Sequence, residues 1–289
     1  MQSNLPIAEV LDLGVRKLKE IVQNPRLDAE LLLAYVLKVD RSYLFLQPNV
    51  LVKSQSVDKY LGLIKRRSNH EPIAYILGRK EFWGLDYLVS SKTLIPRPDS
   101  ETMIEFVLQE FGDNAKLNYH ILDLGTGSGC LGLTLLHEFS NASATLVDIC
   151  SHALEVARKN AERLGLPPNR AKFTRSNWFE NLEHEWYDIV VCNPPYIIPQ
   201  TVLMKDVDQY EPHQALFGMG PRGLGDYETI AKDLKHYLKP SIGLAFFEFG
   251  IGQELWLKEL FIELGYEIAG CKQDLAGIAR VLAIRLKLK

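Results

Sequence analysis

The sequence contains little cysteine, and its four cysteines form no pattern typical of a metal or disulfide site. They are scattered through 289 residues, at Cys130, Cys150, Cys192 and Cys271. No Cys-x-x-Cys pair and no Cys/His ligand spacing occurs, so neither a disulfide framework nor a bound metal is expected. Reduced cysteines in apolar surroundings are typical of a cytoplasmic protein.

Basic charge and long apolar runs are also missing. The net charge is -3 and the isoelectric point is about 6.2, so no general positive field for nucleic acid exists. The short run Lys65-Arg66-Arg67 is interpreted as a solvated helix face. No apolar run is long enough to cross a membrane, and Met1 to Glu9 lacks the basic residues of a signal peptide. We therefore expect no direct nucleic-acid partner, no membrane association and a cytoplasmic location.

The first part of the chain, about residues 7–78, has a helical pattern. Leu27, Leu31, Leu32 and Tyr35 recur at helix spacing, as do Tyr60, Leu61 and Ile64. Four prolines divide the stretch into several short helices (Pro6, Pro25, Pro48 and Pro72). A helical N-terminal domain over residues 1–79 is predicted, with a role in recognition or packing.

A different pattern follows over residues 80–98, which we predict to be a hairpin linker. The run from Phe82 to Val89 is typical of two short strands with a turn near Gly84 to Asp86. Two prolines then bracket Arg97, which is either a fixed functional side chain or an ordinary surface arginine of a linker. A helix is predicted from near Asp99, as its N-cap, to about Phe111.

Beyond Gly112 strands and helices alternate, which predicts a doubly wound, mostly parallel α/β sheet over residues 99–289. The predicted strands are His120–Leu124, Ala144–Ile149, Ala171–Ser176, Tyr187–Cys192, Gly243–Phe249 and Arg280–Leu286. The predicted helices are Cys130–Phe139, His152–Leu164 with Ser151 as N-cap, Tyr227–Leu238 and Glu254–Leu264. The long glycine-rich stretch 197–226 is predicted to be a mobile lid.

A glycine loop directly after the first of these strands predicts a nucleoside-type cofactor. The loop reads Asp123-Leu124-Gly125-Thr126-Gly127-Ser128-Gly129, and Asp148 ends the next strand, where a carboxylate can accept from ribose hydroxyls. With Gly132, the loop also satisfies the dinucleotide expression G-x-G-x-x-G. Asp123 favours S-adenosylmethionine, because a carboxylate there repels a pyrophosphate but can orient the loop or meet a cationic group.

After the third predicted strand comes Asn177-Trp178, beside the expected position of the cofactor base. Trp178 can stack on an adenine, and the Asn177 side-chain oxygen can accept from its exocyclic amine. An equally weighted alternative is a partly buried tryptophan in a loop.

The fourth predicted strand ends in Asn193-Pro194-Pro195-Tyr196. Two prolines stiffen the chain, so the Asn193 amide oxygen and the Pro194 carbonyl can act as fixed acceptors for one substrate NH2 group. Such acceptors align a nitrogen for methyl transfer and stabilise the positive charge that develops on it. Tyr196 can cover the planar substrate group. The structural alternative is a turn that ends a strand, since Asn-Pro often opens a loop.

Together these stretches resemble the glutamine methyltransferases of peptide-chain release factors. Matching stretches span nearly the whole chain: Glu81-Phe82-Trp83, Leu94 to Glu101, Asp123 to Gly129, Asn193 to Tyr196, Glu211-Pro212 with Ala215-Leu216, and Asp274 to Gly277 before Arg280-Val281. Adenine methyltransferases share the Asn-Pro-Pro-Tyr tetrapeptide, but the Arg97 motif is more specific. Many relatives carry Asp at the position of Asn177.

The resemblance implies a helical N-terminal domain, a hairpin linker and a class I methyltransferase domain with a seven-stranded sheet. It implies S-adenosylmethionine as the cofactor and the glutamine of a Gly-Gly-Gln loop in release factors as the substrate. The cofactor residues would be Asp123, Gly125, Thr126, Gly127, Ser128, Gly129, Asp148, Asn177, Trp178 and Asn193. Asn193 to Tyr196, with Arg97 nearby, would hold the glutamine. The alternatives are an adenine-specific DNA methyltransferase and a non-catalytic cofactor-binding scaffold.

Overall fold

A computed structural model describes residues 4–287, and the chain divides into two compact units. One unit holds the chain up to Gly78 together with Leu203–Tyr210, and the other holds Arg79–Val202 and the chain from Glu211 onward. The stretch 80–98, which we expected to be a linker, therefore lies in the second unit. Residues 203–210 fall in the helical unit, although the sequence placed them in the sheet domain. The outermost residues of the predicted domains, 1–3 and 288–289, lie outside the described part.

Helices form the first unit, as the sequence predicted. They are α1 (Ile7–Leu18), α2 (Pro25–Leu37), α3 (Arg41–Leu46), α4 (Ser54–Ser68), α5 (Ile73–Leu77) and α9 (Lys205–Tyr210). A short antiparallel pair, β1 (Leu5–Pro6) with β2 (Leu51–Val52), was not predicted. Helix α9 is held in this unit because the Tyr210 hydroxyl donates to the Asn69 carbonyl at 2.9 Å.

The helices predicted from residue spacing are present as α2 and α4, but the spacing does not identify the buried face of α2, and the interpretation of the cationic run is wrong for Arg67. Helix α2 buries Ala29, Leu32 and Leu33, whereas Leu27 and Tyr35 are exposed. Its apolar residues occur almost all round, so their spacing could not select the buried face. The cationic run is not wholly solvated either, because Arg67 is buried and donates to Asp28 at 2.7 Å.

The second unit is built on a seven-stranded sheet with the order β10-β11-β9-β8-β5-β6-β7. The strands are β5 (His120–Leu124), β6 (Ser143–Asp148), β7 (Ala171–Arg175), β8 (Ile189–Cys192), β9 (Leu244–Glu248), β10 (Tyr266–Gln273) and β11 (Ala279–Leu286). Strands β5 to β9 pair in parallel, and β11 is antiparallel to both β9 and β10. The predicted mostly parallel sheet is confirmed, although β10 was not placed from the sequence.

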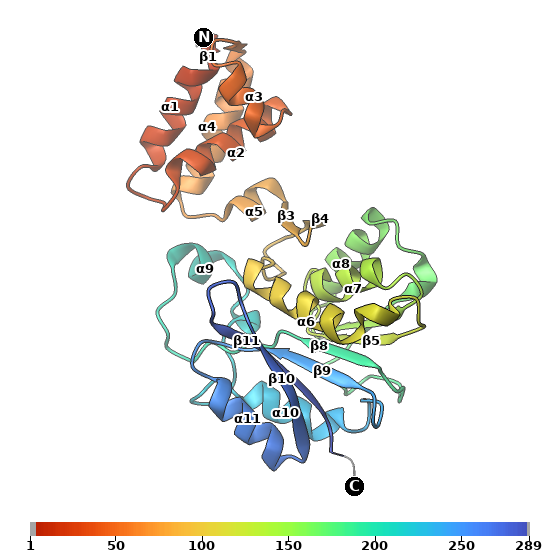
Figure 1. Cartoon of the computed structure of the whole chain (residues 1–289). Helices are drawn as coiled ribbons and strands as arrows, with labels where there is room; N and C mark the ends of the chain where they lie inside the picture. The colour runs from red at the N-terminus through yellow and green to blue at the C-terminus, as the bar shows by residue number, and fades with distance from the viewer. Residues whose placement is uncertain (1–3, 288–289) are drawn as a thin grey trace. The chain divides into compact units, whose positions relative to one another are not determined.

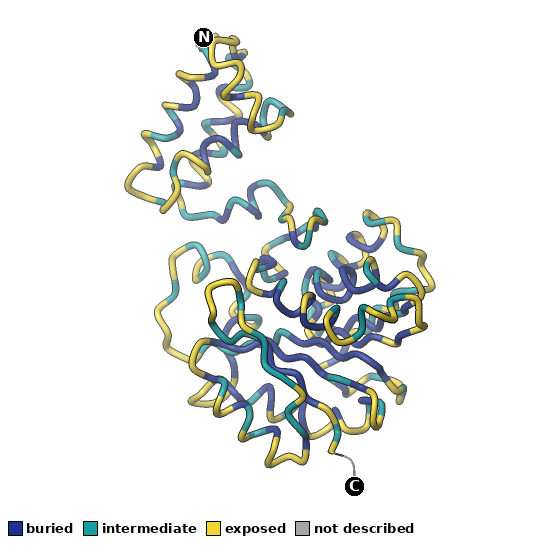
Figure 2. The backbone as a smooth tube through the Cα atoms, viewed as in Figure 1, coloured by how far each residue is buried: buried dark blue, intermediate teal, exposed yellow. Residues whose placement is uncertain are grey.

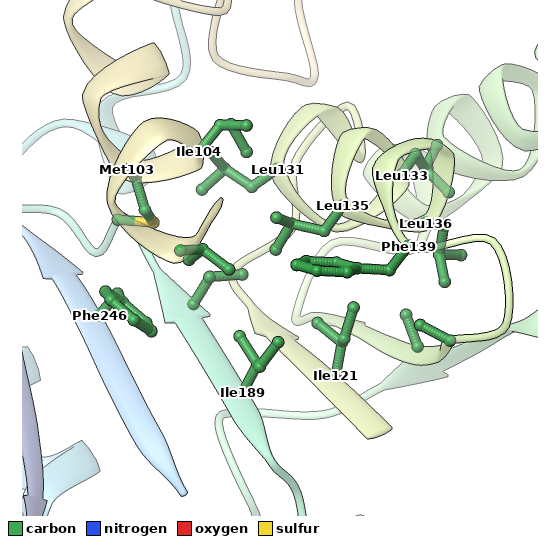
Figure 3. Close-up of a cluster of buried hydrophobic side chains, with 14 of the residues drawn as sticks. Met103, Ile104, Ile121, Leu131, Leu133, Leu135, Leu136, Phe139, Ile189 and Phe246 are labelled. Atoms are coloured by element: carbon green, nitrogen blue, oxygen red, sulfur yellow. The ribbon is translucent and has the colours of Figure 1, made fainter. Parts of the chain in front are cut away.

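Helices cover both faces of this sheet (Figure 1). Successive strand residues alternate between the two layers. On one face Ile121, Ile189 and Phe246 pack with α6 (Glu101–Phe111) and α7 (Cys130–Glu138), as Figure 3 shows. On the other face the neighbouring strand residues pack against α10 (Gly225–Leu234) and α11 (Glu254–Glu263). Helix α8 (Ser151–Arg163) contacts β6 and β7. Figure 2 shows the central strands as the buried layer of this unit.

The predicted hairpin is present ahead of the sheet, and its strands are β3 (Arg79–Phe82) and β4 (Leu85–Leu88). Its turn lies at Trp83-Gly84, slightly earlier than expected, and both residues have positive φ. Two predicted N-caps are wrong. Asp99 lies inside a short 3-10 helix (Pro98–Ser100), and its carboxylate pairs with Arg280 at 2.8 Å. Ser151 is the first residue of α8, one position later than a cap.

Candidate active site

A cavity of about 440 Å³ opens at the carboxyl ends of the parallel strands in the second unit. Ligands in open α/β sheets bind at this edge, where the loops after successive strands converge. The cavity brings together ten of the predicted site residues: Arg97, Gly125, Thr126, Gly127, Ser128, Asp148, Asn177, Trp178, Asn193 and Pro195. Four others do not line it: Asp123, Gly129, Pro194 and Tyr196.

The glycine loop between β5 and α7 turns sharply around the buried Asp123 side chain. The Asp123 Oδ2 atom accepts from the Thr126 hydroxyl at 2.6 Å and from the Gly132 N–H at 2.9 Å. A Cβ atom on Gly132 would lie only 2.8 Å from that oxygen, so the close approach requires glycine. Gly127 has a φ of 56°, a left-handed conformation that glycine adopts without strain.

Asp123 is wholly buried, so of its two expected roles the geometry matches loop orientation. Burial raises its pKa to about 6, although the bonds from Thr126 and Gly132 favour the ionised form. Its second oxygen, Oδ1, has no hydrogen-bond partner among the described residues.

Asp148 ends β6 at the rim of the cavity. Its Oδ2 accepts from the Gly127 N–H at 2.9 Å, and its Oδ1 accepts from the Cys150 N–H at 2.8 Å. The carboxylate thus ties the glycine loop to the start of α8. Each carboxylate oxygen has a second lone pair, which leaves Asp148 able to accept from a bound ligand. Burial raises its pKa.

Asn177 and Trp178 follow β7 and form another side of the cavity. The Asn177 Nδ2 atom donates to Glu180 Oε1 at 2.7 Å, which leaves the Asn177 side-chain oxygen as its free acceptor. Trp178 has a φ of 48°, an uncommon conformation for a bulky residue. A Cβ atom on Gly125 would lie 3.5 Å from the Trp178 ring, so the glycine loop and the indole are close neighbours.

The tetrapeptide Asn193 to Tyr196 leaves β8 in an irregular but well-bonded conformation. Asn193 donates through Nδ2 to the Ser100 Oγ atom at 3.4 Å, and the Tyr196 hydroxyl donates to Glu248 Oε1 at 3.2 Å. Pro194 is buried, while Asn193 and Pro195 face the cavity. The tetrapeptide, for which a strand-ending turn was the alternative interpretation, is therefore a segment held by side-chain hydrogen bonds at the cavity wall.

Glycines of the following loop pack directly on the tetrapeptide backbone. A Cβ atom on Gly218 would lie 2.6 Å from the Pro195 carbonyl oxygen, and one on Gly223 would lie 2.5 Å from that of Tyr196. The buried Gln253 side chain adds a bond, donating to the Tyr196 carbonyl at 2.9 Å. A side chain would not fit at either position, which explains why Gly218 and Gly223 are glycines.

Within the predicted lid, the described structure contains more order than a plain loop. Helix α9, a 3-10 turn at His213–Ala215 and a bridge between Ile197 and Phe217 all lie in it. Its motion stays a prediction.

Arg97 is fixed by a partner far along the chain. Its guanidinium donates to the buried Glu211 carboxylate at 2.5 Å, and the other oxygen of Glu211 accepts from the Ile95 N–H at 3.1 Å. Glu211 therefore fixes both the backbone and the side chain of the segment that carries Arg97.

Three functional candidates were missed at the level of sequence: Ser100, Glu248 and Gln253. Ser100 lines the cavity and contacts Asn193, while Glu248 ends β9 and holds Tyr196. A position at the carboxyl end of a parallel strand was the available signal for Glu248. Ser100 lay inside the motif around Arg97, where it read only as part of a helix start.

The residues around the cavity fit an adenosyl cofactor. The Ser128 Oγ atom lines the cavity and is buried without a partner among the described residues, so it is a donor available to a ligand. The glycine loop presents backbone without side chains, Asp148 supplies acceptors, and Trp178 supplies an aromatic surface beside an amide oxygen on Asn177. The side-chain oxygen of Asn193, an acceptor, belongs to another wall of the same cavity.

Comparison with known proteins agrees with this geometry. Residues 9–78 match the family described as the PrmC N-terminal domain, and residues 99–209 match the methyltransferase small domain. A solved methyltransferase from Pyrococcus furiosus shares the fold at a TM-score of 0.51 with 18% identity, covering 71% of this chain and 90% of its own. The sheet order and these matches define a class I methyltransferase domain that follows a helical N-terminal region in the sequence.

Relatives with an assigned function identify the family more narrowly than the domain matches do. The chain is 38% identical over 268 residues to the release factor glutamine methyltransferase of Agrobacterium fabrum, and the alignment covers 91% of each. It therefore belongs to the release factor glutamine methyltransferase family. It is also 36% identical over 297 residues to a bifunctional methyltransferase of Rickettsia typhi, covering 96% of this chain. The chain spans only 57% of that longer relative.

Among residues 4–287 no helix combines the length and apolar character needed to cross a membrane.

Proposed function

We propose that the chain methylates the side-chain amide nitrogen of a glutamine in the Gly-Gly-Gln loop of peptide-chain release factors, in the cytoplasm. One observation carries the proposal: the Asn193 amide donates through Nδ2 to Ser100, which leaves Oδ1 as its acceptor at the cavity wall. An acceptor, rather than a donor, suits a substrate NH2 group. Family membership supports the choice of a release factor, because the Agrobacterium fabrum relative is named for that substrate.

S-adenosylmethionine is the proposed cofactor, and when bound it supplies an electrophilic methyl group on a sulfonium. Gly125, Gly127 and Gly129 would let it approach the loop backbone, with Thr126 and Ser128 between them. Asp148 would accept from the ribose hydroxyls, and Trp178 would pack on the adenine. Asn177 would accept from the adenine amine through the oxygen that its bond to Glu180 leaves free. Asp123 would act from beneath, by holding Thr126 and Gly132.

At the other wall, Asn193 Oδ1 would accept from the glutamine NH2 group, and the carbonyl of Pro194, a residue that does not itself line the cavity, would be the second acceptor. Holding both N–H groups fixes the nitrogen before reaction, which is the positioning contribution to catalysis. The same acceptors stabilise the positive charge that the nitrogen gains in the transition state. Pro195 would shape the wall, and Arg97 would lie at the rim, held by Glu211. Tyr196 would act mainly by fixing the tetrapeptide, because its hydroxyl is engaged by Glu248.

The test offers the protein S-adenosylmethionine labelled in its methyl group, with release factor and duplex DNA in parallel reactions. Label on the release factor, located by mass spectrometry to the Gly-Gly-Gln glutamine, is expected. Label on DNA alone would instead establish the adenine methyltransferase that shares the tetrapeptide. No transfer to either would favour a non-catalytic cofactor-binding scaffold.

A further inference from the structure

The side chain of Asn160, on α8, is wholly buried and bonds to two separate segments of the second unit. Its Oδ1 atom accepts from the Leu88 N–H at 2.7 Å, and its Nδ2 atom donates to the Leu88 carbonyl at 3.0 Å. The Nδ2 atom also donates to the Ser128 carbonyl at 2.8 Å. Asn160 does not line the cavity, and the methyl transfer proposed above gives its amide no role.

The orientation of the Asn160 amide is fixed by its partners. The Leu88 N–H needs an acceptor and the two backbone carbonyls need donors, so a flipped amide would set like groups against each other at all three contacts. The amide oxygen and both N–H groups are therefore used. A buried amide is costly without such partners, so this side chain is tied firmly to both segments.

One of these segments is the cofactor loop. Ser128 lies between Gly127 and Gly129, which have positive φ of 56° and 84°. A Cβ atom on Gly129 would lie 3.2 Å from that of Ala157, so α8 packs directly against the loop. Ser128 lines the cavity, and its buried Oγ atom has no hydrogen-bond partner among the described residues. The bond from Asn160 thus orients a residue that the proposed cofactor would contact.

The other segment, residues 88–97, is called the wall segment here. It begins at Leu88, the last residue of β4, and its far end is fixed by Glu211, which accepts from Arg97. Between these ends lie the residues that line the cavity: Ser91, Lys92, Thr93, Leu94, Pro96 and Arg97. The wall segment is therefore anchored near both ends, by Asn160 at the first and by Glu211 at the second.

We propose that Asn160 is a positioning residue for both ligands, because it joins the wall segment to the cofactor loop and so sets the distance between these two parts of the cavity. Other bonds hold the same hairpin but lead elsewhere. The Tyr87 and Thr134 hydroxyls, for example, lie 2.7 Å apart and connect β4 to α7. The inference deepens the proposed function and rests on it. No contact with substrate or cofactor is assigned to Asn160.

The first test is Asn160→Ala, which removes all three bonds. With the Ser128 carbonyl released, we expect the affinity for S-adenosylhomocysteine, the cofactor product, to fall about tenfold or more in calorimetry, the scale of one lost hydrogen bond. Because the wall segment is released as well, KM for the release factor should rise about threefold or more.

Tyr87→Phe is the matched control, since it removes a buried bond of the same hairpin without touching the cofactor loop. Both variants should melt at a lower temperature than the parent protein. Only Asn160→Ala should lose affinity for S-adenosylhomocysteine, whereas Tyr87→Phe should stay within about threefold of the parent. Equal losses of affinity in the two variants, or unchanged affinity in a folded Asn160→Ala, would overturn the proposal.

Hydrogen exchange on the parent protein decides the question if Asn160→Ala does not fold. Leu88 does not line the cavity, but its N–H is joined to the cofactor loop through Asn160. Under native conditions, S-adenosylhomocysteine should therefore slow exchange of the Leu88 amide about threefold or more. The Gly84 N–H of the same hairpin, bonded to Glu81 at 2.6 Å, is the control and should exchange at an unchanged rate.

A Leu88 amide that exchanges equally with and without S-adenosylhomocysteine would overturn the role given to Asn160. Calorimetry and hydrogen exchange need no release factor, so they report on Asn160 alone. A parent protein that binds S-adenosylhomocysteine but transfers no label to release factor would overturn the proposed function instead, and the two failures are therefore distinct.

Discussion

Arg97 and Glu211 form an ion pair at 2.5 Å across 114 positions of sequence, with the Glu211 side chain only 1% exposed. The segment that bears Arg97 is thus fixed to the loop beyond the tetrapeptide. Both residues belong to the second unit, so the pair joins the cavity-lining segment of Arg97 to a distant part of the same domain.

Glu211→Ala should destabilise the second unit and misplace Arg97. It leaves the buried Ile95 N–H without its acceptor, which costs about 1–3 kcal/mol of unfolding free energy. Urea denaturation measures this loss, and methylation assays should show a raised KM for the release factor. Glu183→Gln, at an exposed pair with Lys172, is the matched control and should leave both measurements unchanged. Equal effects of the two substitutions would contradict the role given to Glu211.

Gly223→Ala should lower kcat because its Cβ atom would press on the Tyr196 carbonyl at 2.5 Å. Gly220→Ala is the matched control, since Gly220 also has a positive φ but no neighbour within 4 Å of a Cβ atom. The control should lose about 1 kcal/mol of stability from backbone strain and keep its kcat. Circular dichroism melts and single-turnover rates distinguish the two. If both variants retain full rate, close packing on the tetrapeptide does not matter for activity.

Asp148→Ala should weaken S-adenosylmethionine binding about 10-fold to 100-fold, which corresponds to about 1.4–2.8 kcal/mol of lost hydrogen bonding. Part of this loss comes through the loop, because Asp148 also holds the Gly127 N–H. Isothermal calorimetry measures the affinity directly. Unchanged affinity would mean that the ribose hydroxyls lie elsewhere.

Asp123→Asn should stabilise the protein more as pH rises. Burial raises the Asp123 pKa from 3.8 to about 6, so ionisation of this group opposes folding. Its contribution to stability is fully present below about pH 4 and is lost as pH rises through about 6. The variant minus parent difference in unfolding free energy should therefore increase between about pH 4 and about pH 7, by up to about 3 kcal/mol. A difference that stays constant over that range would contradict the assignment.

Local patterns made much of the fold predictable from sequence. His120–Leu124 is an apolar strand followed at once by glycines, so strand and loop were both evident, and β5 has the predicted bounds. Helix α2 is present as predicted, but its buried face could not be predicted because apolar residues cover most of its surface. Strand β10 was missed, and its exposed and half-buried residues explain why no apolar run marked it.

The site was predictable where one stretch carries its own geometry, as in the glycine loop. The site could not be predicted where a residue's hydrogen-bond partner lies far away in the sequence. Nothing near Asn193 in the sequence indicates that Ser100 receives its amide, or that Glu248 receives the Tyr196 hydroxyl. Asp99 illustrates the same limit, because pairing with Arg280 outweighed the capping role that its local sequence favoured.

The most direct test of the proposed role of Asn193 compares the parent protein with Asn193→Ala, using release factor and labelled S-adenosylmethionine. The account predicts that kcat falls by about 10²-fold or more while calorimetric cofactor affinity stays nearly unchanged, because the acceptor acts on the substrate nitrogen. Comparable turnover by Asn193→Ala would contradict the account.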